Sequence, residues 1–218
     1  MTIRTAVFDL DGTLIDSLGL ILASYRHTMQ THLGHELPDE MWTAGMGTPL
    51  AVQMRHFARA DDEAEEMVET YQTHNLANHD RLVRPYAGVR DSVAALRDRG
   101  VTLAIATSKR STATGMGLRA CGLPEEWFAA IVTADDVIRP KPDPEPVLLA
   151  LKLSGESDPS RAVYLGDSVY DMRAGRAAGV ITAAVLWGPN SRETLLPTKP
   201  DLWLTDPAEI EGLLQASF

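Results

Sequence analysis

The chain has 218 residues, 44% of them hydrophobic and 23% charged, and this composition excludes a disordered or collagen-like protein. Its 20 basic and 30 acidic residues give a net charge of −10, which argues against nucleic acid and anionic membranes as partners. The single cysteine, Cys121, allows no intrachain disulfide. No apolar run reaches the roughly 20 residues of a membrane span, and the N-terminus has a strand pattern where a signal peptide would be apolar. We therefore expect a cytoplasmic protein.

Apolar runs of strand length alternate with segments of helical length along most of the chain. The expected strands are Ile3–Phe8, Val101–Ala106, Ala130–Thr133, Ala162–Gly166 and Gly179–Leu186. The expected helices are Val89–Arg99, Thr112–Cys121, Pro144–Leu153 and Val169–Ala178. This alternation predicts right-handed crossovers and an α/β fold with a doubly wound parallel sheet covered on both faces.

The segment from Asp16 to Val83 interrupts the alternation because it contains no strand-like run. Apolar residues at helical spacing indicate a first helix around Leu18–Leu33, and further helices are expected from Pro49 and over Asp61–Asn78. We therefore expect an α/β core made of residues 1–15 and 84–218, with an all-helical segment, residues 16–83, inserted after the first strand.

Two carboxylates, Asp9 and Asp11, follow the first expected strand, directly before Gly12. Ligands of open α/β sheets bind at the carboxyl ends of strands, and residues two apart in an extended chain point the same way. A plain Asp-Gly turn is the alternative interpretation. Two like charges this close are costly unless a cation or a proton separates them, which favours a metal or catalytic site.

A second acidic pair, Asp167 and Asp171, follows another expected strand and opens a helix. Spacing of four residues allows both to share one helical face, although Asp167 alone could be a helix cap. Combined with Asp9 and Asp11, these carboxylates form an oxygen cage that suits Mg²⁺.

Two further loops offer groups that bind phosphate. Thr107 and Ser108 lie between an expected strand and a helix, where a phosphate can receive hydroxyl and backbone N–H bonds, although Ser108 alone could cap the helix. Lys141, one of four lysines in the chain, lies between Pro140 and Pro142, which restrict where its amine can point.

Taken in order, Asp9–Leu14, Thr107, Lys141 and Gly166–Asp171 resemble the four motifs of the haloacid dehalogenase-like hydrolase superfamily. The helical insertion resembles the cap of its phosphoglycolate phosphatase-like branch, and the match covers nearly the whole chain. The resemblance implies a Rossmann-like catalytic core and a cap domain at residues 16–83.

The resemblance also implies roles for the motif residues. Asp9 would be the nucleophile that forms an aspartyl-phosphate, and Asp11 would protonate the leaving group and then deprotonate the hydrolytic water. Thr107 and Lys141 would hold the transferring phosphoryl group, assisted by Ser108. The implied ligands of Mg²⁺ are Asp9, the backbone carbonyl of Asp11, Asp167 and Asp171, the last directly or through water.

Three features of the sequence differ from those of related families in the superfamily, and they narrow the class of reaction. Asp11 argues against dehalogenation, an insertion without lysine argues against phosphonatases, and Ile21 stands where sugar-phosphate mutases of this branch carry histidine. We expect a Mg²⁺-dependent phosphatase for a small phosphorylated metabolite, a phosphoglycolate-like monoester, in a monomer or homodimer. Inorganic pyrophosphate, a nucleotide or a sugar phosphate is the alternative substrate. A non-catalytic phospholigand-binding module is the alternative from another class.

Substrate choice is expected to come from the cap. The loop around Gly45, Met46 and Gly47 resembles the specificity loop that faces the active site in this branch, and a plain connection between helices is the alternative. Arg55, and less so Arg26, could bind a substrate carboxylate or second phosphate, although neither matches a motif.

Overall fold

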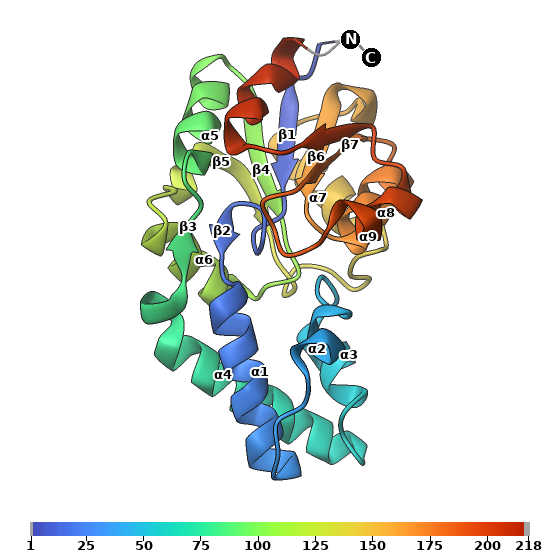
Figure 1. Ribbon diagram of the computed structural model, residues 1–218. Helices are drawn as coiled ribbons and strands as arrows, with labels where there is room; N and C mark the ends of the chain where they lie inside the picture. The colour runs from blue at the N-terminus through green and yellow to red at the C-terminus, as the bar shows by residue number, and fades with distance from the viewer. Residues whose placement is uncertain (1, 216–218) are drawn as a thin grey trace.

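A parallel six-stranded sheet forms the centre of the molecule in a computed structural model, which describes residues 2–215 (Figure 1). The strand order is β5–β4–β1–β6–β7–β8. The strands are β1 (Thr5–Phe8), β4 (Thr102–Ala106), β5 (Phe128–Val132), β6 (Ala162–Gly166), β7 (Ile181–Val185) and β8 (Leu202–Leu204). The predicted doubly wound parallel sheet is confirmed, with β8 as an additional edge strand.

Helices cover both faces of this sheet. The helices of this part are α5 (Val89–Asp98), α6 (Ser111–Ala120), α7 (Glu145–Ser154), α8 (Val169–Ala178) and α9 (Arg192–Leu195). Short 3₁₀ helices are η1 (Glu125–Trp127), η2 (Pro159–Arg161), η3 (Leu196–Thr198) and η4 (Pro207–Gln215). Ala6 and Phe8 of β1 pack in one apolar cluster with α5, α6 and η4, whereas Val7 packs in another with α7 and α8. This alternation is what a strand buried on both faces requires.

The chain leaves β1 to one side and returns to the other. The segments after β1 build β4 and β5 on one side of it, and the later segments build β6, β7 and β8 on the other. The strand order therefore reverses beside β1. Such a reversal opens a crevice at the carboxyl ends of the strands, where ligands of α/β folds bind.

Four helices lie within residues 16–83, where the sequence predicted three. They are α1 (Leu18–Leu33), α2 (Asp39–Thr43), α3 (Leu50–Arg55) and α4 (Asp61–Leu82), of which α2 is the additional one. Their own apolar cluster is built around Tyr25, Trp42 and Tyr71, in which the Tyr25 and Trp42 rings stack with centroids 4.7 Å apart. None of the described helices is both long and apolar enough to cross a bilayer.

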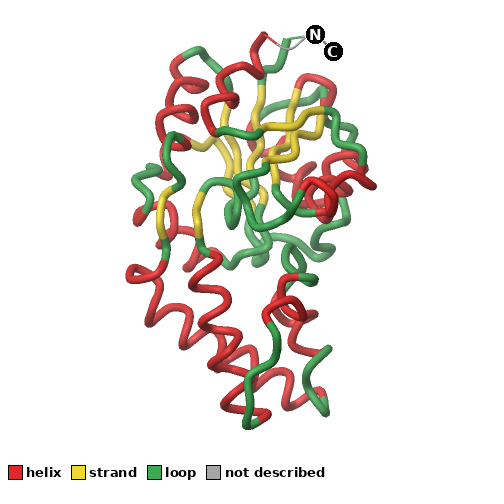
Figure 2. The backbone as a smooth tube through the Cα atoms, viewed as in Figure 1, coloured by secondary structure: helices red, strands yellow, loops and turns green. Residues whose placement is uncertain are grey.

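A two-stranded antiparallel sheet, β2 (Ile15–Asp16) with β3 (Arg84–Pro85), joins these helices to the rest of the chain. The helices extend away from the large sheet on the side toward which the arrow of β1 points (Figure 1), and they form the lower part of the tube view (Figure 2). We call residues 16–83 the helical segment. Its standing as a separate cap domain stays a prediction.

Candidate active site

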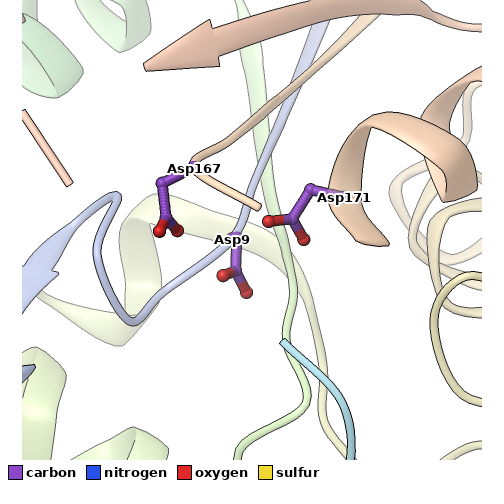
Figure 3. A group of neighbouring side chains, drawn as sticks. All are labelled: Asp9, Asp167 and Asp171. Carbon is purple, nitrogen blue, oxygen red and sulfur yellow. The ribbon is translucent and has the colours of Figure 1, made fainter. Parts of the chain in front are cut away.

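Three aspartates lie together beside the central strands (Figure 3). Asp9 follows β1, Asp167 follows β6, and Asp171 lies in the first turn of α8. One carboxylate oxygen of each lies within 4.8 Å of the others, and all three residues are buried. The structure thus brings together residues from both acidic motifs at the crevice beside β1.

Glycine permits this close approach at two positions. Gly12 has a φ of +79°, and a β-carbon there would lie 2.7 Å from the Asp167 carboxylate. A β-carbon at Gly166 would overlap that of Asp171. Any other residue at either position would therefore displace an aspartate.

Lys141 inserts its ammonium group among these carboxylates. Its Nζ lies 2.8 Å from Asp9 Oδ1, 2.6 Å from Asp171 Oδ1 and 3.1 Å from the Tyr164 hydroxyl oxygen. The side chain is only 1% exposed. An ammonium has three N–H donors, and all three have acceptors here.

The buried charges shift one another's protonation. Burial raises the pKa of Asp9 to about 7, against the opposing charge of Lys141. Burial, reinforced by Asp171 and Asp9, raises the pKa of Asp167 well above its usual range. Burial disfavours charge on Lys141 too, but Asp171 and Asp9 hold its pKa well above the ordinary value. Three carboxylates face one ammonium, so a further cation would let all three ionise together.

Asp9 and Asp167 have oxygens free for such a cation. Among the described residues no donor contacts Oδ2 of Asp9, and the hydrogen bonds that reach Asp167 from Thr13 Oγ1 and Asn190 Nδ2 are long, at 3.5 and 3.4 Å. Carboxylate oxygens are the ligands that Mg²⁺ prefers. The donor set therefore fits a hard divalent cation held by Asp9 and Asp167.

Asp171 is occupied by protein donors. Its Oδ1 faces Lys141 and the Tyr164 hydroxyl, and its Oδ2 accepts the backbone N–H and hydroxyl of Ser168 at 3.0 and 2.6 Å. Ser168 in turn accepts the Asp171 N–H, which closes a capping box at the start of α8. Asp171 thus fixes both Lys141 and the start of this helix.

Asp11 has a different environment, since its side chain is 22% exposed. Its Oδ1 accepts the Ser17 hydroxyl at 2.6 Å and the Lys109 ammonium at 2.8 Å. The sequence analysis did not select Lys109, because 98 residues separate it from Asp11 and no local pattern marks the pair.

A cavity of about 680 Å³ opens onto this site. Its wall includes most of the predicted site residues, namely Asp9, Asp11, Met46, Gly47, Thr107, Ser108, Lys141 and Asp167. Thr107 is buried at the end of β4, and its hydroxyl accepts the Lys109 N–H at 3.2 Å. Side chains from the sheet and from the helical segment therefore face one cavity.

The loop before α3 touches the sheet side of this cavity. The Ser108 hydroxyl donates to the Gly47 carbonyl at 2.9 Å. Gly47 has a φ of +98°, and a β-carbon there would lie 2.8 Å from Ser168 Oγ. The backbone at Gly47 thus packs directly against two loops of the sheet.

Three other predicted residues lie elsewhere. Gly45 is not among the residues that line the cavity, and Arg55 is exposed at the end of α3. The register of this short helix turns Gln53 and Met54 inward, which leaves Arg55 on the outer side. Arg26 pairs with Asp39 on the surface.

The chain matches the family described as haloacid dehalogenase-like hydrolase over residues 6–185. It is 40% identical over 216 residues to the pyrophosphatase PpaX of Bacillus pumilus, covering 99% of this chain and 98% of that protein. It is 37% identical to PpaX of Anoxybacillus flavithermus, over 98% of each chain.

Solved structures share the fold over the full length. A predicted phosphoglycolate phosphatase from Haemophilus somnus superposes with a TM-score of 0.88 at 23% identity, covering 98% of each chain. A haloacid dehalogenase-superfamily hydrolase from Geobacter sulfurreducens superposes with a TM-score of 0.71 at 26% identity, covering 97% of this chain and 96% of that one.

Proposed function

Because the chain belongs to the haloacid dehalogenase-like hydrolase family, we propose that it is a Mg²⁺-dependent phosphatase that acts on a small phosphorylated compound through an aspartyl-phosphate at Asp9. The observation that carries this proposal is the buried group of Asp9, Asp167 and Lys141 at the wall of the cavity. Pyrophosphate, which the relatives' name indicates, is the first substrate to test, and phosphoglycolate is the second. A cytoplasmic location and a monomeric or homodimeric state belong to the same proposal.

Asp9 has the geometry of a nucleophile. Lys141 holds its carboxylate through Oδ1 at 2.8 Å, which fixes the group so that one oxygen can attack while the other faces the cation. In the first step a bond forms between one Asp9 carboxylate oxygen and phosphorus while the bond from phosphorus to the leaving oxygen breaks. Thr107 then faces the oxygens of the transferring group as a donor, and Lys141 adds its fixed positive charge beside them.

Asp11 is the candidate for proton transfer. It lies at the cavity wall, two residues after Asp9, and is more exposed than the three buried carboxylates. In the proposed cycle it gives a proton to the leaving oxygen and then takes one from the water that hydrolyses the aspartyl-phosphate.

Asp9 and Asp167 would hold Mg²⁺ with the backbone carbonyl of Asp11. The ion, when bound, would supply positive charge to the phosphoryl oxygens. Asp171, whose oxygens already accept hydrogen bonds from the protein, acts in this proposal through Lys141. It is therefore a positioning residue.

Replacement of the nucleophile tests the covalent mechanism. Phosphate release from pyrophosphate and phosphoglycolate in Mg²⁺ is expected to fall by about 10⁴-fold or more in Asp9→Asn. Acid quenching of the wild-type protein during turnover is expected to trap phosphate on Asp9. The control is Asp91→Asn, which alters a carboxylate on α5 that is 85% exposed and is expected to change turnover less than about twofold. Full turnover in Asp9→Asn would contradict the mechanism.

A further inference from the structure

Lys109 is a cation in the cavity wall to which the catalytic cycle proposed above gives no task. Its Nζ lies 2.8 Å from Asp11 Oδ1, and its side chain is 9% exposed. We propose that Lys109 binds a second anionic group of the substrate, placed within a few bonds of the leaving oxygen. This inference rests on the proposed function and specifies its substrate class.

Among the described residues, Lys109 has N–H donors without an acceptor, which distinguishes it from the other cations of the cavity wall. Those other cations are Lys141 and Arg110. Lys141 has acceptors for all three N–H groups, and Arg110, which is 64% exposed, pairs with Asp135 at 2.8 Å. Asp11 is the one acceptor of the Lys109 ammonium among the described residues. Two of its three N–H donors therefore stay available to a ligand.

The contact with Asp11 limits where the second anion can lie. Asp11 is the residue proposed to reach the leaving oxygen, and Lys109 Nζ lies within hydrogen-bond distance of its carboxylate. A group held by Lys109 must therefore be close to the leaving oxygen. In pyrophosphate the second phosphorus is bonded directly to that oxygen, and in phosphoglycolate one methylene separates it from the carboxylate.

The part of the cavity wall that belongs to the helical segment disfavours substrates with a charged group far from the scissile bond. The helical segment contributes apolar and neutral polar residues to the cavity, including Ile21, Trp42, Leu50 and Gln53, and no charged side chain among the described residues. A phosphate or carboxylate several bonds from the scissile bond would lose water there without gaining a cation. The wall therefore favours short dianionic substrates over nucleotides and sugar bisphosphates.

Binding of such a substrate also changes the surroundings of Asp11. An anion held by the two free N–H donors of Lys109 shares the charge of the ammonium with Asp11 and so weakens its attraction for the Asp11 carboxylate. Asp11 then keeps the Ser17 hydroxyl as a partner and can turn toward the leaving oxygen. The second anion therefore adds binding and releases the group that transfers the proton.

Comparison of two substrates separates this subsite from a purely positioning role. The measurement is kcat/KM for phosphoglycolate and for 2-hydroxyethyl phosphate, whose leaving alcohol needs a similar proton but carries no second anion, in wild type and Lys109→Met. The ratio of the two values is expected to fall at least about 30-fold, the size of one charge-assisted hydrogen bond. A lysine that only positioned Asp11 would lower both values alike and leave the ratio unchanged, which would overturn the proposal. In the control Arg110→Met the ratio is expected to change less than about threefold, because Arg110 is already paired.

Inhibition of the wild-type protein tests the same point without a mutation. Methylenediphosphonate and methylphosphonate differ by the second anionic group, and methylenediphosphonate is expected to inhibit turnover of p-nitrophenyl phosphate at least about tenfold more tightly. Equal inhibition constants would overturn the subsite. A wild-type protein that releases phosphate from no substrate would overturn the proposed function, whereas turnover with equal inhibition constants would overturn only the role of Lys109.

Discussion

The two walls of the cavity differ in the charge of their side chains. The sheet wall carries aspartates and lysines that hold one another through short contacts, such as the 2.6 Å distance from Lys141 Nζ to Asp171 Oδ1. The wall from the helical segment carries no charged side chain among the described residues, and its surface is apolar or neutral. The contrast indicates a division of tasks in the proposed function: the sheet wall supplies the charges for phosphoryl transfer and for a second anion at Lys109, whereas the helical segment supplies an uncharged surface that limits the rest of the substrate.

Among changes away from the nucleophile, replacement of Asp167 or Asp171 should have the largest effect. Asp167→Asn is expected to weaken Mg²⁺ activation at least about 100-fold, because it removes a ligand with open oxygens. Asp171→Asn is expected to lower kcat by a similar factor but to shift the Mg²⁺ requirement less than about threefold, since Asp171 acts through Lys141. Phosphate release as a function of Mg²⁺ concentration measures both, and circular dichroism checks that each variant folds.

Equal loss of Mg²⁺ activation in the two variants would contradict the separate roles of Asp167 and Asp171. That result would return Asp171 to the set of metal ligands, as the family resemblance implies. The oxygens of Asp171 would then have to exchange Lys141 or Ser168 for the ion.

Gly47→Ala, a substitution where the two walls of the cavity meet, should have a smaller effect on activity. Ser168 Oγ is fixed by two contacts with Asp171, so it cannot yield to a β-carbon 2.8 Å away at position 47. Gly47→Ala must therefore move the loop and break its hydrogen bond with Ser108. We expect kcat/KM to fall by about 30-fold, which corresponds to about 2 kcal/mol of lost contacts.

Gly34→Ala is the matched control for this loop. Gly34 ends α1 with a φ of +78°, and no atom lies within 4 Å of the position that a β-carbon would take. The variant is expected to lose about 1 kcal/mol of stability from backbone strain and to change kcat/KM less than about twofold. Equal kinetic losses at both glycines would show that strain alone explains the effect.

The sequence predicted that the aspartates of the two acidic motifs would lie together because its signals there are local. Val169–Ala178 has the predicted bounds, since Ser168 caps its start and Gly179 ends it. Asp9, Asp167 and Lys141 stand directly after strands or in a stiff loop, so the topology alone brings them together. By contrast, β8 has only three residues, too few for a periodic pattern.

The sequence predicted the other contacts poorly because they depend on tertiary structure. Lys109 meets Asp11 only after β4 has paired with β1, and nothing in either segment marks the contact. The exposure of Arg55 depends on the register of the six-residue helix α3, which apolar spacing cannot define over so short a length. Neutral wall residues such as Ile21 and Leu50 look the same in sequence as ordinary core residues.

The smallest expected effect is on how the stability of the protein depends on pH, and it arises from carboxylates of the sheet wall. Without metal, burial raises the pKa of Asp9 to about 7, whereas the unfolded value is near 3.8. Between these values the folded protein binds more protons than the unfolded chain, so the free energy of unfolding of the metal-free protein decreases as pH rises through this window. Mg²⁺ binds the ionised carboxylate, and below pH 7 it must displace the proton.

Stabilisation by Mg²⁺ should therefore be weaker at pH 6 than at pH 8. One proton displaced over one pH unit below the pKa weakens binding about tenfold, or about 1.4 kcal/mol, which corresponds to roughly 3 to 5 °C in Tm for a chain of this size. Thermal unfolding with and without saturating Mg²⁺ at the two pH values measures the difference. Asp9→Asn should reduce this pH dependence, because Asp167 is then the one proposed side-chain ligand that still exchanges a proton for the ion. A shift in Tm that is the same at both pH values in the wild type would place the ion away from Asp9.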